Sequence, residues 1–240
     1  MPETKKTQKT QTPEPADAEA PRDKPRREPL TRDRIVRAGL RLMDEEGLEA
    51  VSMRHVGREL GVEAMSLYNH VKDKDDLLDC IIELAMGEFE VSPPSGDWAE
   101  EIRTAAHAWR RLLTAHPKVM TLLVERNHPL TSIQAMRPIE IALDILRRAG
   151  LAERDAVQAF RSFGGFIFGY VMMEVGNMVA GVGEDAQMVG IEALRAMLPA
   201  DELPRFVELL PELTACDSDA DFEFGLSLLI AGLRAKIQAG

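Results

Sequence analysis

Residues 52–74 of this 240-residue chain read SMRHVGRELGVEAMSLYNHVKDK, and this stretch decides the fold. Ser52 can cap a short helix, a Gly-Val pair can make a tight turn, and another helix is predicted from about Glu63 to Val71. Apolar residues recur at helical spacing on the side that would pack inward: Met53, Val56, Leu60, Val62, Leu67 and Val71. These are the proportions of a DNA-binding helix-turn-helix, although helix corners with glycine also serve simply as packing devices.

Two longer helices are predicted on either side of this stretch. Thr31 can cap the first, which Gly47 ends, and Asp73 can cap the other, which continues through about Phe89. Their apolar faces can pack on the two short helices and are formed by Ile35, Val36, Leu40, Leu42, Met43, Leu77, Leu78, Ile81 and Leu84. The segment VSPPSG at 91–96 is the clearest boundary in the chain, because its prolines and glycine interrupt helices.

Beyond this boundary the pattern remains helical. Helices are predicted near 98–116, 118–126, 132–149, 154–181, 185–197, 201–212 and 219–238, and runs of alternating β-branched residues are absent. The chain is therefore predicted to be all-α. Its expected parts are a disordered tail at 1–30, which is nearly devoid of large apolar residues, a small three-helix helix-turn-helix domain at 31–90, and a larger helical domain at 97–240.

Composition restricts the possible functions. The formal net charge of −11 argues against a broadly basic protein that coats nucleic acid, so any DNA contact must come from a confined face. The apolar stretch 160–182 contains Arg161, Glu174 and Asn177, which favours a buried helix over a membrane span. Cys80 and Cys216 form no CxxC pair, which fits two core thiols in a reduced, cytoplasmic setting.

The outward side of the helix-turn-helix carries side chains that can recognise DNA. Met65, Ser66 and Asn69 are predicted to share one face of the second short helix, with Tyr68 beside them. Asn can pair with adenine and Met can contact a thymine methyl group in the major groove. Donors for phosphate oxygens surround this face and are Arg54, Tyr68, His70, Lys72 and Lys74.

The segment from Thr31 to Phe89 resembles the N-terminal domain of the TetR family of bacterial repressors. The resemblance is carried by IVRAGLRLMDEEGLEAVSMR, by the turn LGV and by LYNHVKDKDDLL, with its lysine-flanked acidic turn. It implies that Arg54 touches a base or phosphate, that Lys74 holds a phosphate, and that the recognition helix carries Ala64, Met65, Ser66, Tyr68, Asn69 and His70. Tetracycline repressors have a Gln-Pro pair where Ala64 and Met65 stand, so a different operator sequence is expected.

The segment DWAEEIRTAAHAWRRLLTAHP at 97–117, and RRAGL before a Phe- and Gly-rich helix, look like the ligand-binding and dimerisation domain of the tetracycline-repressor branch. This resemblance implies a homodimer formed through helices near 154–181 and 219–238, on a palindromic operator with half-sites about 34 Å apart. Small and aromatic residues could support that interface, namely Gly164, Gly165, Gly169, Phe166, Phe168 and Tyr170. The alternative is that these residues pack inside one subunit.

A small-molecule effector is expected in the larger domain. Candidate apolar lining residues, each of which could instead be ordinary core, are Met86, Trp109, Met120, Leu123, Met136, Phe160 and Phe163. Polar residues that could orient a ligand are His107, His128 and Asn177. By the resemblance, Trp109 aligns with an aromatic residue that lines the antibiotic site of tetracycline repressors.

The effector is expected to differ from tetracycline. Histidines that help to hold the magnesium-chelated drug in that branch fall on Glu90 and near Leu123, and the acidic magnesium partner aligns with Met173 beside Glu174. These departures favour an apolar effector, without a metal or other cofactor. His128 or Glu174 would restore a ligand for the metal if the alignment shifted by a residue or two.

The alternatives are an enzyme or a carrier that acts on an apolar small molecule through the larger domain. No HExxH, Walker or GxGxxG pattern is present, and His107 with Glu100 or Glu101 is the one conceivable acid–base pair. We therefore expect a ligand-responsive repressor rather than an enzyme. The predicted helix from Lys74 to Met86 would connect the DNA-reading helices to the effector site.

Overall fold

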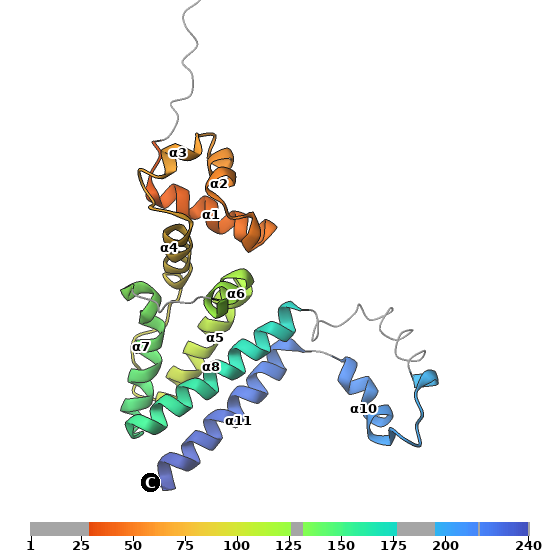
Figure 1. Ribbon diagram of the computed structural model, residues 1–240. Coiled ribbons are helices and arrows are strands. Elements are labelled where there is room, and N and C mark those ends of the chain that lie inside the picture. The colour runs from red at the N-terminus through yellow and green to blue at the C-terminus, as the bar shows by residue number, and fades with distance from the viewer. Residues whose placement is uncertain (1–28, 126–131, 177–194, 216, 240) are drawn as a thin grey trace, which may run out of the picture. The chain divides into compact units, whose positions relative to one another are not determined.

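The helix-turn-helix stretch folds into two short helices, α2 (Met53–Leu60) and α3 (Ala64–Leu67), in a computed structural model of the chain (Figure 1). Gly61 ends α2 with φ 66°, in the left-handed region that favours glycine. Gly57 lets the two helices approach, because a Cβ there would lie 3.0 Å from the carbonyl oxygen of Val62. The structure describes residues 29–125, 132–176, 195–215 and 217–239.

The flanking helices begin and end close to where the sequence predicts. Helix α1 (Arg32–Glu46) starts after Thr31, whose hydroxyl accepts the Arg34 N–H, and ends at Gly47 with φ 95°. Helix α4 (Lys74–Met86) starts after Asp73, whose carboxylate accepts the Asp76 N–H at 2.9 Å. It ends before the predicted Phe89, because tighter turns begin at Gly87. The shared core is fully buried and contains Ile35, Met43, Val56, Leu67, Leu77 and Ile81.

The third helix is shorter than predicted. Helix α3 ends at Leu67, and Tyr68, Asn69 and His70 form a turn. The cause lies in the next helix, because the Asp76 carboxylate accepts the Lys72 N–H at 2.7 Å and draws the chain into the extended cap of α4. Local periodicity continues to Val71, but this capping interaction ends the helix first.

The larger part of the chain is also helical. It contains α5 (Trp98–Ala115), α6 (Pro117–Glu125), α7 (Ile133–Arg148), α8 (Glu153–Val175), α10 (Pro204–Thr214) and α11 (Ser218–Ala239). Helices α5, α7 and α8 pack on one another, and α11 lies along α8 (Figure 1). Helix α4 contacts α6 and α7, and α1 also contacts α6, so the two groups of helices meet there.

The predicted all-α class is confirmed for the part of the chain that the structure describes, which contains no strand. No described helix is both long and apolar enough to cross a membrane. Of residues 1–30, the structure describes only Pro29 and Leu30. The predicted tail, most of the helix predicted at 185–197, the end of the one at 154–181, and Cys216 lie outside the described residues, whereas Cys80 is buried as expected.

The aromatic residues expected at a dimer interface pack largely inside the chain. Phe166 stacks on Phe222 with ring centroids 5.3 Å apart, and Tyr170 meets the same ring edge-on at 5.2 Å. Gly225 makes room for this cluster, because a Cβ there would lie 2.5 Å from the Phe166 ring. Phe166 and Tyr170 therefore pack within one subunit, which was the alternative to a place in the dimer interface.

Candidate DNA interface and effector cavity

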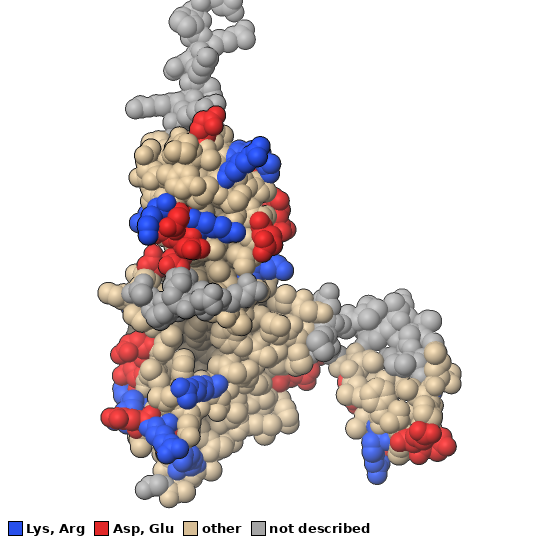
Figure 2. Space-filling model, viewed as in Figure 1, with Lys and Arg blue, Asp and Glu red and all other residues tan. Residues whose placement is uncertain are grey.

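Helix α3 presents a small, uncharged surface. Leu67 is completely buried and anchors the helix, whereas the Met65 side chain is 74% exposed and Ser66 is half-buried beside it. Tyr68 and Asn69 are exposed in the following turn, so Asn69 does not share a helical face with Met65 as predicted. The surface over α3 is mostly uncharged, and a basic cluster lies over α2 (Figure 2).

Basic side chains surround this surface. Arg54 is exposed near the start of α2, and Lys74 is exposed at the first residue of α4. Lys72 is exposed as well, with its ammonium 3.8 Å from Asp73, while His70 and Ala64 are half-buried. All these positions lie on α2, on α3, in the turn before α4 or at the first residue of α4, within 21 residues of the chain.

The acidic residues of the segment KDKDD build the turn that holds the lysines. Asp73 caps α4, and Asp76 accepts the Lys72 N–H and pairs with Arg32 of α1 at 2.9 Å. Two of the negative charges are therefore engaged by backbone N–H groups and a guanidinium. Asp73 and Asp76 therefore support the geometry of the motif.

A second candidate site is a partly open apolar cavity of about 70 Å³ between α5, α7 and α8. Its lining holds no charged side chain and consists of Ile102, Ala105, Ala106, Trp109, Ala142, Leu146, Phe160, Phe163, Gly164, Ile167 and Phe168. The Trp109 indole N–H is the one side-chain hydrogen-bond donor in this set. Such a lining favours a ligand with apolar surfaces and gives no compensation for a buried charge.

The structure brings together some of the predicted lining residues. Trp109, Phe160 and Phe163 line the cavity, whereas Met86 and Met120 are buried outside its lining. Leu123 is half-buried and Met136 is 41% exposed, also outside the lining, and His128 and Asn177 lie outside the described residues. Four small residues that leave the space open were not predicted as part of this site: Ala105, Ala106, Ala142 and Gly164. The sequence could have indicated Ala105 and Ala106, because they lie one helical turn before Trp109. Ala142 and Gly164 lie on the facing helices α7 and α8.

An aromatic chain connects the cavity to α4. Trp109 contacts Phe168 with ring centroids 6.1 Å apart, and it contacts Phe89 at 5.5 Å. Phe89 follows the end of α4, whose first residue is Lys74. A change in the position of Trp109 can therefore reach the helix that leads to the DNA-reading end.

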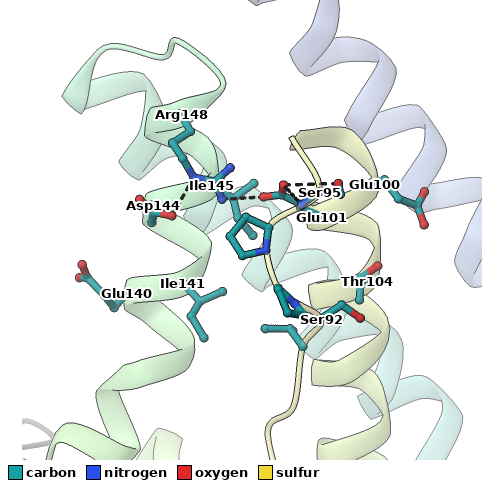
Figure 3. A pocket seen from close by; sticks show the side chains of 13 residues that line it. Ser92, Ser95, Glu100, Glu101, Thr104, Glu140, Ile141, Asp144, Ile145 and Arg148 are labelled. Atoms are coloured by element: carbon teal, nitrogen blue, oxygen red, sulfur yellow. Dashed lines mark hydrogen bonds and ion pairs between the residues drawn. The ribbon is translucent and has the colours of Figure 1, made fainter. Parts of the chain in front are cut away.

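The linker 91–96 is attached to α5 by a buried carboxylate. Glu101 accepts N–H groups of Ser95 at 2.7 Å and Gly96 at 2.8 Å, and it pairs with Arg148 of α7 at 2.6 Å (Figure 3). The hydrogen bond from Arg148 is the main reason that the pKa of Glu101 lies below its usual value. Glu101 is thus engaged in structure and does not form the acid–base pair with His107 that the sequence left open.

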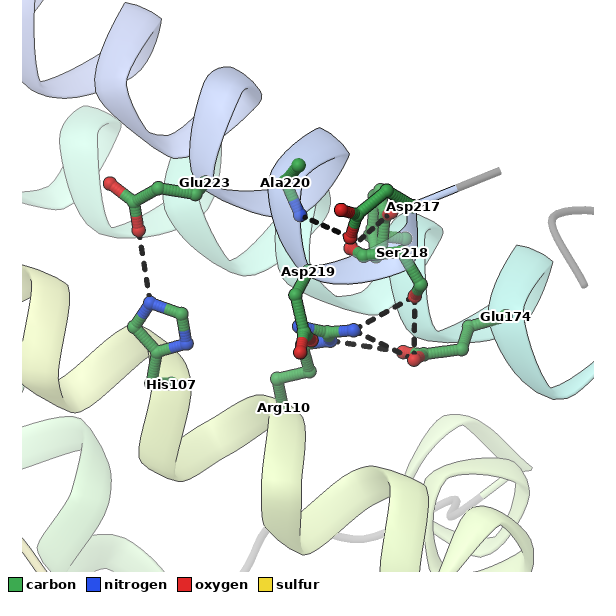
Figure 4. Close-up of polar contacts among 9 residues, drawn as sticks. His107, Arg110, Glu174, Asp217, Ser218, Asp219, Ala220 and Glu223 are labelled. Carbon is green, nitrogen blue, oxygen red and sulfur yellow. Dashed lines mark hydrogen bonds and ion pairs between the residues drawn. The ribbon is translucent and has the colours of Figure 1, made fainter. Parts of the chain in front are cut away.

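A polar network centred on the buried Arg110 joins α5 to α8 and α11 (Figure 4). The Arg110 guanidinium donates to Glu174 at 2.7 Å, to the exposed Asp219 at 2.7 Å and to Ser218 at 2.8 Å. His107 lies on the same helix with its Nε2 3.0 Å from Glu223, outside the apolar cavity. Glu174, the carboxylate considered for a metal, is bound by Arg110, and no group of metal-binding side chains occurs among the described residues.

Comparison with known proteins decides the family. Residues 35–81 match the model of bacterial regulatory proteins of the tetR family, and residues 91–237 match that of the tetracyclin repressor-like C-terminal domain. The chain belongs to the TetR family. It is a DNA-binding transcriptional repressor of that family and not an enzyme, as the sequence predicted.

Relatives in the TetR family cover most of the chain. The HTH-type transcriptional repressor DrrR1 of Streptomyces coeruleorubidus is 30% identical over 87% of this chain and 78% of its own length. The tetracycline repressor protein class C of Escherichia coli is 29% identical over 85% of this chain and 90% of its own length. Among solved structures, apo ActR from Streptomyces coelicolor is 32% identical over 88% of this chain and 98% of its own, with a TM-score of 0.72. ActR has also been solved in complex with actinorhodin, with a TM-score of 0.71 to this chain at 33% identity over 88% of this chain and 99% of its own.

Proposed function

We propose that this repressor binds a palindromic operator as a homodimer and is released by an uncharged, largely apolar small molecule. The observation that carries the proposal is the cavity between α5, α7 and α8, which has no charged lining residue and connects through Trp109 and Phe89 to α4. Within this proposal, residues 31–90 read the DNA, residues 97–240 bind effector and partner, and residues 1–30 are a solvated tail. The protein acts in the cytoplasm, where its operator is.

The exposed part of α3 reads the operator in the major groove. Met65 is mostly exposed and can contact a thymine methyl group, and the Ser66 hydroxyl can donate to or accept from a base edge. Ala64 lies beside them at the start of α3. Phosphate contacts fix the docking and come from Arg54 and Lys74, with Tyr68, Asn69, His70 and Lys72 contributing from the turn.

The dimer forms through α8 and α11, over residues 154–181 and 219–238. Exposed small and apolar residues lie along both helices in the described part: Gly165, Gly169, Met172 and Met173 on α8, and Phe224, Leu228 and Gly232 on α11. A Cβ added at any of the three glycines would meet nothing within 4 Å, so a partner helix can approach closely. Two-fold symmetry then presents two α3 helices to half-sites about 34 Å apart.

Effector binding has to enlarge the cavity. Sites for drug-sized ligands typically measure about 300–1,000 Å³, several times the 70 Å³ of this cavity. Entry of a ligand therefore displaces the rings of Trp109 and Phe168, and Phe89 transmits the displacement to α4. A differential affinity of about 1–3 kcal/mol between two arrangements of α4 is enough for a typical allosteric response. The complex of ActR with actinorhodin supports a small-molecule effector in this fold.

The chain contains a matched pair of tryptophans for the test. Trp109 lines the cavity, whereas Trp98, at the start of α5, lies outside its lining and beneath the Arg234 guanidinium. We expect Trp109→Ala to leave the mobility shift of the DNA upstream of its own gene nearly unchanged. We also expect it to weaken release of that DNA by apolar aromatic compounds about tenfold or more, a loss of roughly 1.4 kcal/mol.

Trp98→Ala should respond to these compounds like the unchanged protein. Loss of both operator binding and effector response in the Trp109 variant would assign this residue to the core rather than to the effector site. The absence of a shift with every neighbouring palindrome, in the unchanged protein, would overturn the proposed operator.

A further inference from the structure

His116 occupies a position between the DNA-reading helices and the effector-binding helices. It is the residue that ends α5, and its side chain is 13% exposed. Its Nδ1 lies 2.8 Å from a carboxylate oxygen of Asp44 in α1, and its Nε2 lies 3.1 Å from a carboxylate oxygen of Glu88 just after α4. One imidazole ring thus joins three elements, and two of them carry the helix-turn-helix.

Both contacts can be hydrogen bonds at the same time only if each ring nitrogen carries a proton. Ionised carboxylates only accept hydrogen bonds, so the ring can donate to both Asp44 and Glu88 only as an imidazolium. A neutral ring would turn one lone pair toward a carboxylate oxygen. The other carboxylate oxygen of Asp44 is buried and has no hydrogen-bond partner among the described residues, so the charge of Asp44 depends on His116 for compensation.

The charges that act on the His116 ring come from Asp44 on α1 and from Glu88 after α4. Burial disfavours the charged ring, but hydrogen bonds and attraction from Glu88 and Asp44 outweigh it and raise the pKa of His116 above its usual value. Arg37, on the exposed side of α1, also attracts Glu88, but its hydrogen bonds go to Asp33. The other histidine of α5, His107, shows the opposite behaviour, because burial and neighbouring arginines lower its pKa.

We propose that His116 is a proton-dependent positioning residue that holds α1 and the end of α4 against α5 when it is charged and releases them when it is neutral. We call the contacts of His116 with Asp44 and Glu88 the joint. Trp109 lies seven residues before His116 on α5, so the effector cavity and the joint involve the same rigid helix. The inference that this joint regulates operator binding rests on the proposed function. The existence of the joint itself does not.

The direction of the pH dependence follows from the raised pKa. A histidine whose pKa is higher in the folded than in the unfolded protein stabilises the fold fully at pH values below its ordinary value of about 6.5. That stabilisation is lost as the pH rises through the pKa of the folded state. The joint is therefore closed at pH values below the ordinary pKa of histidine and opens as the pH rises through the raised pKa of His116.

The experiment uses the full chain without operator or effector. In NMR titrations of the histidine rings, the His116 ring should lose its proton at a higher pH than His107, and its pKa should fall in both Asp44→Asn and Glu88→Gln. Amide hydrogen exchange, corrected for the intrinsic pH effect, should show about three- to tenfold less protection at the C-terminal end of α1 at pH 8.5 than at pH 6. In His116→Gln this pH dependence should disappear, whereas His107→Gln should retain it.

A His116 pKa at or below the ordinary value, or equal pH dependence in His116→Gln and the unchanged protein, would overturn the joint. If His116→Gln does not fold, the titrations of the unchanged protein and of the two carboxylate variants decide the matter. Mobility shifts at pH 6 and pH 8.5 then test the regulatory step. For each protein, the operator affinity at pH 6 is divided by the affinity at pH 8.5. This ratio should be about three times nearer to one in His116→Gln than in the unchanged protein. Equal ratios would limit His116 to structure, and a missing shift in every protein would contradict the proposed function alone.

Discussion

Helices α1 to α4 carry the DNA-reading surface, and helices α5 to α11 form the part of the chain with the proposed effector site. The two groups of helices are held together by different interactions. The first group depends mainly on local devices, such as the caps Thr31 and Asp73 and the left-handed Gly61, together with the ion pair of Arg32 with Asp76. The second also has local caps, at Asp97 and Ser132, but its buried Arg110 reaches Glu174, 64 residues away. Local devices specify where helices begin and end, whereas the distant pairs specify which helices meet.

Replacement of the α3 anchor should have the largest effect. Leu67 is completely buried, so Leu67→Ala should lower the free energy of unfolding by about 3 kcal/mol and abolish operator binding with it. The matched change Met65→Ala removes a mostly exposed side chain on the same helix. It should alter stability by less than about 0.5 kcal/mol while changing operator preference. Urea unfolding and mobility shifts would measure both, and equal destabilisation by the two changes would contradict the anchor role of Leu67.

Removal of the buried guanidinium in the effector domain should come next. Arg110→Met leaves Glu174 without its main partner, so we expect a loss of about 2 kcal/mol in unfolding free energy. Glu174 keeps partial contact with water, which places the expected loss below the range for fully buried pairs. Arg111→Met, at the exposed neighbouring position, is the control and should change stability little. Adding Glu174→Gln should recover part of the loss, and the absence of any recovery would argue against the pair.

Two glycines should respond in opposite directions, with the smallest effects. Gly61→Ala places a side chain at φ 66° and should destabilise the protein by about 1 kcal/mol. Gly164 lies inside α8, and an added Cβ would meet nothing within 4 Å, so Gly164→Ala should stabilise the helix by up to about 1 kcal/mol. The same methyl group projects from a cavity-lining residue and should weaken effector binding. Thermal unfolding distinguishes the two signs, and destabilisation by both changes would show that Gly164 is also needed for packing.

Much of the DNA-reading region could be predicted from the sequence because its determinants are close together in the chain. The starts of α1, α2 and α4 follow from side-chain caps within three residues of the N–H groups that they satisfy. The length of α3 could not be predicted in the same way. It depends on Asp76 reaching back to the Lys72 N–H, an interaction that periodicity does not reveal.

The candidate effector site was predictable only in part. Trp109, Phe160 and Phe163 attract attention as large apolar residues, but Met86 and Met120 have the same chemistry and lie outside the cavity lining. A cavity exists where side chains are small, and whether an alanine faces a cavity or a neighbouring helix depends on how the helices cross. The residues that leave the space, among them Ala105 and Gly164, carry no distinguishing chemistry of their own.

The sequence by itself determined the helical class, the helix boundaries of residues 31–86 to within a few positions, and the family, because these depend on patterns repeated every few residues. Only the tertiary structure decided that Arg110 meets Glu174, that Glu101 meets Arg148, and that His116 lies between Asp44 and Glu88. The physical reason is that a hydrogen bond or ion pair depends on distance in space. For residues separated by 28 to 72 positions, as the partners of His116 are, that distance is set by the packing of whole helices.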